Sequence, residues 1–190
     1  MQISEEPVAL ASELAAIPIS FKVDRIFEVK QTDGHIQLTE APVSNFWQKN
    51  YDGLPGEGPT RWAQNFDLTN WALFTARLQD RLIGGALIAF NTPGVVMLEG
   101  RADLAVLWDI RVHPDYRQQG VGAALLRKAE TWSYRKRARQ LKVETQNINV
   151  PACRFYEGNG FQLRSANRLA YPTLPDEIQL IWVKELTVGA

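Results

Sequence analysis

Apolar and polar residues alternate in several stretches of the first half of the chain, as they do in strands with one buried face. Residues 21–30 alternate in this way, a QTDG turn follows, and residues 35–43 return, which predicts a β-hairpin. Residues 71–78 and 81–90 are separated by two residues and predict a second hairpin. Residues 45–65 are rich in Gly, Pro, Trp and charge, which predicts a loop with one or two short helices.

The hydrophobic pattern changes in the second half of the chain. Residues 102–112 are strongly apolar, which fits a strand buried on both faces. Over residues 121–137 the apolar positions recur with the period of an amphipathic helix. The stripe consists of Val121, Ala124, Leu125, Ala129 and Trp132. Residues 141–147, 161–171 and 177–186 are predicted as three further strands.

A short helix is predicted over residues 149–160. Asn149 suits the N-cap, Pro151 lies in the first turn, and Gly158 or Gly160 ends the helix. No internal repeat or linker interrupts the pattern. We therefore expect one mixed α/β domain spanning residues 1–190.

Composition places the chain among ordinary globular proteins, with 45% hydrophobic and 22% charged residues. Lys plus Arg equals Asp plus Glu at 21 each, so no net charge favours nucleic acid or an anionic membrane as a partner. The N-terminus has no basic region, and the longest apolar stretch, around residues 82–90, is too short to cross a bilayer. We expect a cytoplasmic protein. Its single cysteine, Cys153, excludes an internal disulfide, and no metal site is expected.

The most informative stretch follows the apolar strand. Arg117-x-x-Gly120-x-Gly122 opens the long helix, where unpaired backbone N–H groups and the helix dipole attract phosphate. The pattern is neither a Walker sequence nor the dinucleotide G-x-G-x-x-G. The alternative is a tight strand-to-helix turn that needs glycine only for its backbone conformation.

A second motif lies on the short helix. Asn149, Ala152 or Cys153, and Tyr156 recur at spacings that place them on one face. The alternative is a capped helix whose Tyr156 packs partly in the core.

Together, and in this order, the two motifs resemble those of the GNAT superfamily of N-acetyltransferases. DIRVHPDYRQQGVGAALL resembles the acetyl-CoA-binding motif with its core R/Q-x-x-G-x-G/A. The downstream pattern N-x-x-A-x-x-x-Y-x-x-x-G-F is matched by Asn149, Ala152, Tyr156, Gly160 and Phe161. More narrowly, VETQNINVPACRFYEGNGF and FKVDRIFEV are similar to streptothricin acetyltransferases, which acetylate the β-lysine amine of an antibiotic. This narrower likeness covers nearly the whole chain and is weakest over residues 45–65.

The resemblance implies a GNAT-type α/β (α+β) fold in a single domain, with its acetyl-CoA-binding core at residues 71–165. Such a fold has a mixed, twisted sheet of about seven strands with splayed central parallel strands, flanked by about four helices. Backbone amides of residues 117–122 would hold the CoA pyrophosphate, and a β-bulge near residues 109–112 would free an N–H for the thioester carbonyl. The acetyl-CoA-binding residues would be Ile110, Arg111, Val112, Arg117, Gln118, Gln119, Gly120, Val121, Gly122, Asn149 and Ala152.

The acceptor amine must lose a proton, because an alkylamine with a pKa near 10.4 arrives protonated at neutral pH. Asp109 is the first candidate for the base, with a structural ion pair to Arg111, two residues along the same strand, as the equal alternative. Glu144 is the second candidate, or a substrate contact. His113, directly before Pro114, is expected to serve the turn rather than catalysis.

The resemblance also assigns Tyr156 as the proton donor to the departing CoA thiolate, a role that suits a phenol with a pKa of about 10. No activating His or Lys lies near Cys153 in the sequence, so we expect direct transfer in a ternary complex rather than a covalent acetyl-enzyme.

We therefore expect an acyltransferase, an acetyl-CoA-dependent N-acetyltransferase acting on a primary amine of a small molecule such as a streptothricin-like antibiotic or a polyamine. A protein or peptide N-acetyltransferase and a non-catalytic acyl-CoA-binding module remain the alternatives, and a homodimer stays open. Carboxylates and aromatic rings that would suit a cationic acceptor are Asp52, Glu57, Asp67, Glu144, Trp47, Tyr51 and Trp62.

Overall fold

Two groups of segments build the protein in the computed structural model, which describes residues 1–187. Unit 1 contains Met1–Ile19, Asn50–Leu141 and the chain from Glu185 on. Unit 2 contains Ser20–Lys49 and Lys142–Lys184. Each unit has its own strands and its own α-helix longer than one turn.

The strands of unit 1 lie in the order β1, β4, β5 and β6, and neighbouring strands are antiparallel. Their bounds are β1 (Gln2–Glu6), β4 (Ala72–Leu78), β5 (Arg81–Phe90) and β6 (Leu104–Val112). The hairpin of β4 and β5 and the apolar strand β6 were predicted and are confirmed. The pattern does not predict β1, because its five largely solvent-accessible residues show no clear alternation and pair with a strand far along the chain.

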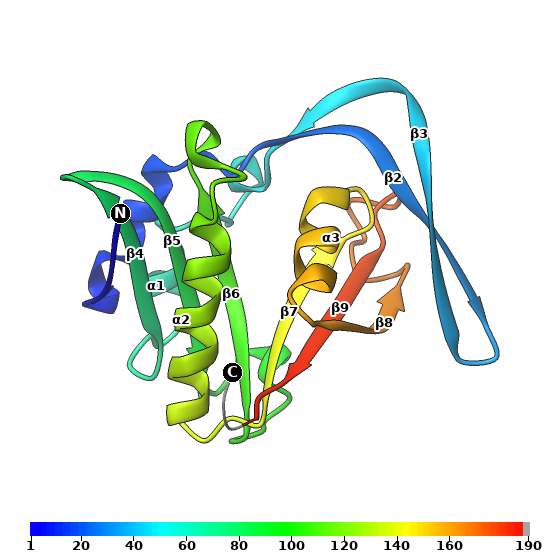
Figure 1. Cartoon of the computed structure of the whole chain (residues 1–190). Coiled ribbons are helices and arrows are strands. Elements are labelled where there is room, and N and C mark those ends of the chain that lie inside the picture. Colours follow the sequence, from blue (N-terminus) through cyan, green and yellow to red (C-terminus); the bar gives the residue numbers. More distant parts are fainter. Residues whose placement is uncertain (188–190) are drawn as a thin grey trace. The chain divides into compact units, whose positions relative to one another are not determined.

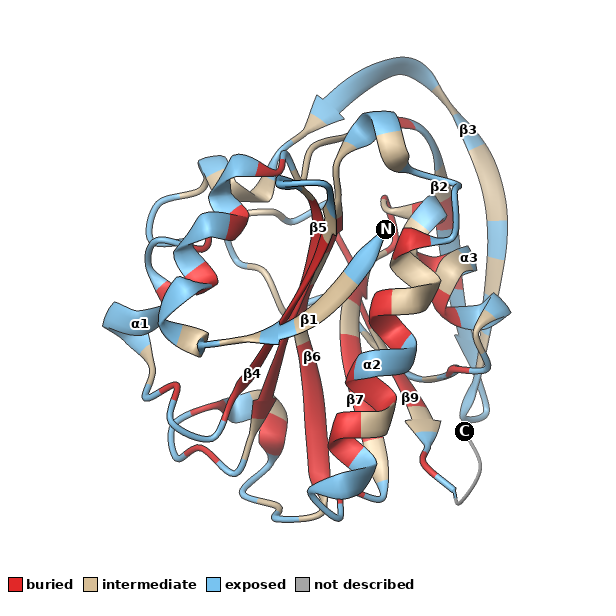
Figure 2. Cartoon of the chain, turned by 60° about the vertical axis from the view of Figure 1, so that its left-hand side comes forward, coloured by how far each residue is buried: buried red, intermediate tan, exposed pale blue. Residues whose placement is uncertain are grey.

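Different segments cover the two faces of these strands. On one face, η1 (Val8–Ala16) and α1 (Trp62–Asn65) pack over a cluster that includes Leu87 and Val106. On the other face, α2 (Val121–Arg135) contacts β4, β5 and β6. Figure 2 shows these three strands as largely buried. The helix predicted over residues 121–137 is thus confirmed, and it ends two residues early.

The prediction of a loop with short helices over residues 45–65 is correct only in part. It contains η2 (Tyr51–Gly53) and α1, but residues 45–49 belong to a strand instead. Two further short 3-10 helices of unit 1 are η3 (Val96–Leu98) and η4 (Pro114–Tyr116). The long 3-10 helix η1 has no counterpart among the predicted elements.

In unit 2 the predicted hairpin consists of β2 (Phe21–Thr32) and β3 (His35–Lys49), the long ribbon in Figure 1. Asp33 and Gly34 form its turn with φ angles of 49° and 81°, the left-handed conformation that two-residue hairpin turns require. Both strands continue beyond the predicted residues because they pair with each other, including between Phe21 and Lys49.

The remaining strands of unit 2 lie in the order β7, β9 and β8. The elements are β7 (Gln140–Gln146), α3 (Val150–Gly158), β8 (Gln162–Asn167) and β9 (Gln179–Glu185). All four were predicted, although β8 and β9 are shorter than expected. The unit boundary falls within β7, after Leu141.

Asn147 joins three segments of unit 2 and is only 3% exposed. Its backbone N–H and its side-chain oxygen bond Ile178, and its backbone oxygen and side-chain N–H₂ bond Phe27. All its principal polar groups are thereby satisfied, as burial demands. Asn147 therefore fixes β2 and the start of β9 to the end of β7.

Within residues 1–187 the two units contain seven strands besides the β2–β3 hairpin, which confirms the mixed α/β class. The predicted splay of two central parallel strands concerns strands of different units and stays a prediction, as does the single-domain organisation. Within residues 1–187 no helix is both long and apolar enough to span a membrane. The same residues contain no group of three His, Cys, Asp or Glu side chains suited to a metal ion.

Candidate active site

A β-bulge interrupts the pairing of β5 with β6. Ile88 lies opposite Leu107, but the next residue of β5, Leu87, lies opposite Asp109, so Trp108 is the extra residue. The bulge was predicted near residues 109–112 and lies one residue before that range. An extra residue in one strand leaves its backbone N–H out of the regular ladder and turns the side chains that follow to the other face.

The bulge places Asp109 and Arg111 on the face covered by η1. Asp109 lies opposite Leu87, which belongs to the apolar cluster on that face. Arg111 lies opposite Gly85, where a Cβ would come within 2.2 Å of a methyl group of Leu14 in η1. Glycine at position 85 therefore lets η1 approach the strands next to the Arg111 guanidinium.

Arg111 is the centre of a buried ion-pair cluster. Its Nε and Nη2 donate to the two carboxylate oxygens of Asp109 at 2.8 and 2.6 Å. Its Nη1 and Nη2 donate to Asp52 at 2.7 and 3.2 Å. Nη1 also donates to the carbonyl oxygens of Leu14 and Ile17, at 3.4 and 3.2 Å.

The two carboxylates of the cluster stabilise the charge of the buried Arg111 side chain. Burial opposes its charge, but hydrogen bonds and charges from Asp109 and Asp52 outweigh burial and raise the pKa of Arg111 above its ordinary value. The predicted Asp109–Arg111 pair is present in the structure. Asp52 was named only as a carboxylate for the acceptor, because the sequence gives no sign that η2 meets β6.

The turn between β6 and α2 has the geometry of an anion cradle. Gly120 is the N-cap of α2, with φ 81°, and Gln118 also has a positive φ of 61°. The first backbone bond of the helix runs from the N–H of Ala124 to the oxygen of Gly120. The N–H groups before Ala124 therefore have no partner within the helix. A Cβ added at Gly120 would meet nothing within 4 Å, so the approach to this turn is open.

Arg117 fixes the turn through its side chain. Its Nε donates to the oxygen of Val112 at 3.0 Å and its Nη2 to that of Pro18 at 3.1 Å. Burial lowers the pKa of Arg117. His113 caps η4 by accepting from the N–H of Asp115, so it lies in the turn as expected.

The helix α3 begins as predicted. The side chain of Asn149 accepts from the N–H of Ala152 at 3.2 Å, so both residues serve the N-cap. Cys153 is buried next to Thr145, and burial raises the pKa of its thiol to about 11. Tyr156 is 4% exposed, and its ring makes edge contacts with Phe155 and Phe161.

Glu144 belongs to a second polar cluster, in unit 2. Its two oxygens accept from the Tyr171 hydroxyl at 2.5 Å and from the Gln179 amide at 2.6 Å. The Tyr171 oxygen accepts in turn from Gln146 at 3.1 Å. Burial and then the charge of Glu144 raise the pKa of Tyr171 well above its usual value. Sequence reasoning missed Tyr171 and Gln179, which lie far along the chain from β7.

The predicted site residues thus divide between the units. Residues 109–122 lie in unit 1 and Glu144, Asn149, Ala152 and Tyr156 in unit 2. Two other candidates for binding the acceptor lie in unit 1. Asp67 accepts hydrogen bonds from the hydroxyl and the backbone N–H of Thr69, which lower the pKa of the Asp67 carboxyl. Glu57 is exposed.

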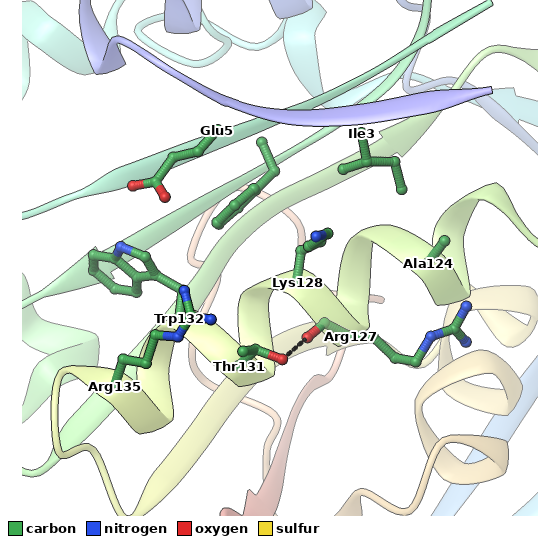
Figure 3. A pocket seen from close by; sticks show the side chains of 9 residues that line it. Ile3, Glu5, Ala124, Arg127, Lys128, Thr131, Trp132 and Arg135 are labelled. Carbon is green, nitrogen blue, oxygen red and sulfur yellow. Dashed lines mark hydrogen bonds between the residues drawn. The ribbon is translucent and has the colours of Figure 1, made fainter.

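A pocket of about 380 Å³ lies elsewhere in unit 1, between β1 and α2. Figure 3 shows Ile3 and Glu5 of β1 on one side and Lys128, Thr131 and Arg135 of α2 on the other. None of the predicted acetyl-CoA-binding residues lines this pocket. It is therefore separate from the cradle at the start of α2.

Comparison with known proteins agrees with this geometry. The model of the acetyltransferase (GNAT) family matches residues 40–161. Streptothricin acetyltransferase A of Bacillus subtilis is 35% identical over 113 residues, which are 58% of this chain and 60% of that protein. The match therefore spans less than two thirds of that relative. Streptothricin acetyltransferase of Escherichia coli is 32% identical over 96% of this chain and 94% of that protein.

One solved structure matches almost the whole length of this chain. It is of a protein from Bacillus anthracis, assigned as a streptothricin acetyltransferase, in complex with acetyl coenzyme A. The two chains are 25% identical with a TM-score of 0.76, and the match covers 98% of each. The chain belongs to the GNAT family of acetyltransferases, and streptothricin acetyltransferases are among its most similar relatives.

Proposed function

We propose that this enzyme transfers the acetyl group of acetyl-CoA directly to a primary amine of a small polycationic molecule, with a streptothricin-like antibiotic as the acceptor class. The turn that joins the bulged strand β6 to α2 carries this proposal. It combines unpaired helix N–H groups with an open approach at Gly120. The names of the relatives support the acceptor class, and the family supports the reaction.

The turn fits the pyrophosphate of CoA. The first N–H groups of α2, which follow the left-handed Gly120, have no partner within the helix, and the helix dipole favours an anion there. Backbone amides of residues 117–122 would hold the phosphates, while the Arg117 side chain keeps the turn in place. When bound, acetyl-CoA supplies the acetyl group as an activated thioester.

The bulge at Trp108 provides a backbone N–H that the β5–β6 ladder does not require. A donor of this kind next to the reacting carbonyl stabilises the negative charge that develops on its oxygen. Ile110 and Val112, which follow the bulge, would pair with the pantetheine arm.

Direct transfer requires that protons leave the acceptor amine and that one proton reaches the CoA sulfur. An acceptor ammonium gives up one proton to water before the reaction, and the neutral amine nitrogen then bonds the acetyl carbon as the bond to the CoA sulfur breaks. The nitrogen's second proton leaves to water as the amide forms. We assign the proton that the departing sulfur gains to the Tyr156 hydroxyl, which then recovers one from water. Cys153 is unsuited to a covalent route, because a thiol with a pKa of about 11 holds its proton at neutral pH.

The geometry of Asp109 favours the structural role over that of the base. Both of its carboxylate oxygens accept from Arg111, and its side chain is 6% exposed. A carboxylate that is held at both oxygens by one guanidinium forms a strong, directional structural pair. Asp109 therefore maintains the strand next to the bulge by holding Arg111.

An amine panel tests the function. Purified protein is mixed with acetyl-CoA and with streptothricin, spermidine, lysine amide or a peptide with a free N-terminus, and the released CoA thiol is measured. We expect saturable turnover of the polycationic small molecules. Turnover of peptide N-termini alone would reject the small-molecule acceptor and retain the acetyltransferase.

A further inference from the structure

The partners of the Glu144 carboxylate differ from those of the other buried or half-buried carboxylates of unit 2. Glu177 pairs with Lys49, and Glu40 pairs with Arg25 and Arg154. Glu144 is held only by two neutral donors, Tyr171 and Gln179, among the residues that the structure describes. A half-buried carboxylate without a cation is electrostatically costly, so a charge from outside the protein would complete this cluster.

The neutral donors fix the direction of the carboxylate. Glu144 and Gln146 are two residues apart on β7 and so project from the same face. Gln146 donates to the Tyr171 oxygen, which leaves the Tyr171 proton directed at Glu144. Gln179, at the start of β9, holds the second oxygen. A carboxylate has about four lone-pair sites, and the described residues use two of them.

Tyr171 remains a donor at every pH at which the enzyme would work. Its pKa is raised first by burial and then by the nearby charge of Glu144, with Glu177 adding to the effect. The hydroxyl therefore keeps its proton, and the Glu144 carboxylate keeps its orientation.

We propose that Glu144 binds an ammonium group of the polycationic acceptor and that Tyr171 and Gln179 are positioning residues for the Glu144 carboxylate. The inference rests on the proposed function, since it names how the polycationic acceptor is recognised. A purely structural network would instead serve to attach residues 168–178 to β7. That attachment is already made by Asn147, whose backbone and side chain both bond Ile178.

The test separates substrate binding from stability and from chemistry. Glu144→Gln keeps the shape and removes the charge, and Tyr171→Phe removes only the hydroxyl. Glu28→Gln and Tyr134→Phe are the matched controls, because both residues are exposed. For each variant, KM and kcat are measured with streptothricin and with spermidine, together with calorimetric acetyl-CoA affinity and Tm.

We expect Glu144→Gln to raise KM for the amine by about 10–100-fold, the size expected for a charge-assisted hydrogen bond. Tyr171→Phe should raise it by about 3–10-fold, as one neutral hydrogen bond is lost. Acetyl-CoA affinity should not change. In the double variant the loss of the hydroxyl should add little, because the carboxylate that it positions is gone.

Two results overturn the inference in different ways. If the wild type acetylates these amines and both variants keep its KM, Glu144 does not bind the acceptor, while the proposed function stands. If the wild type acetylates neither amine, the proposed function fails and the inference fails with it. Should Tyr171→Phe lower Tm strongly, Gln179→Leu tests the same positioning from β9, with an equal rise in KM expected.

Discussion

Arg111 donates two hydrogen bonds, of 2.8 and 2.6 Å, to the two carboxylate oxygens of Asp109, on a strand where a bulge has turned both side chains to the face covered by η1. The same guanidinium reaches Asp52 in η2. Three residues from two distant segments thus form one buried cluster, and a single cation holds two carboxylates. We therefore expect the stability of β6 to depend on this cation.

Arg111→Met should destabilise the protein by about 3–5 kcal/mol, because it leaves two carboxylates without their cation in a buried site. Urea unfolding measures the loss. The matched control is Arg101→Met, which removes a partly exposed pair with Asp103 and should cost much less, because solvent screens that pair. Equal losses in both variants would show that the Arg111 cluster contributes no more than a surface pair.

Asp109→Asn distinguishes a structural carboxylate from a base. We expect lower Tm, since an amide replaces one charge of the cluster, and an acidic limb of the kcat/KM profile that stays in place. The limb should remain because Arg111 donates to both oxygens of Asp109, which gives this carboxylate a structural partner instead of the acceptor amine. Removal or displacement of the limb would identify Asp109 as the base after all.

Gly122→Glu places a negative charge in the first turn of α2. The charge suits the helix dipole, so the fold should be retained, but it repels a pyrophosphate at the same N–H groups. Calorimetry should show a loss of acetyl-CoA affinity of at least about 10-fold. Gly122→Ala adds a methyl group without charge and serves as the control, with affinity within a few-fold of wild type. Wild-type affinity in the Glu variant would exclude the cradle.

Tyr156→Phe should lower kcat by about 10²–10⁴-fold if this hydroxyl protonates the departing sulfur. The affinity for acetyl-CoA should change little, since the ring still packs between Phe155 and Phe161. Tyr134→Phe, on the exposed part of α2, controls for the loss of a hydroxyl. Normal turnover in the Tyr156 variant would leave this residue with a packing role alone.

Burial of Cys153 predicts a specific dependence of stability on pH. Its thiol has a pKa of about 11 when folded, against 9.0 for an ordinary thiol, because burial disfavours the thiolate. The folded state therefore holds the proton more tightly than the unfolded chain. This contribution to stability is fully present below about pH 9 and is lost as the pH rises toward 11.

Alkylation by iodoacetamide at pH 8 tests the raised pKa of the Cys153 thiol. Native Cys153 should react about 100-fold more slowly than an exposed thiol, in line with the smaller thiolate fraction. Cys153→Ala combined with Ser44→Cys supplies an exposed thiol in the same unit for comparison. Equal rates would mean that Cys153 is accessible and ionised in the folded protein.

Local features of this protein could be predicted from its sequence. Helix α2 follows from a 3.6-residue period that begins after Gly120, and the Asn149 cap of α3 follows from its own side chain. The β2–β3 and β4–β5 hairpins follow from alternation around short turns. In each case the residues that decide the structure are near neighbours in the chain.

The clusters around Arg111 and Glu144 depended on contacts between distant segments. Alternation along β6 without a bulge would have kept Val106 and Asp109 on opposite faces, and only pairing with β5 put the extra residue at Trp108. Asp52 reached Arg111, and Tyr171 reached Glu144, from segments whose sequences carry no regular pattern. The sequence therefore determined the strands, helices and motifs, because these depend on local period and turn chemistry. The partners of each carboxylate were decided by the tertiary structure, because a hydrogen bond across 27 or 59 residues exists only after the chain has packed.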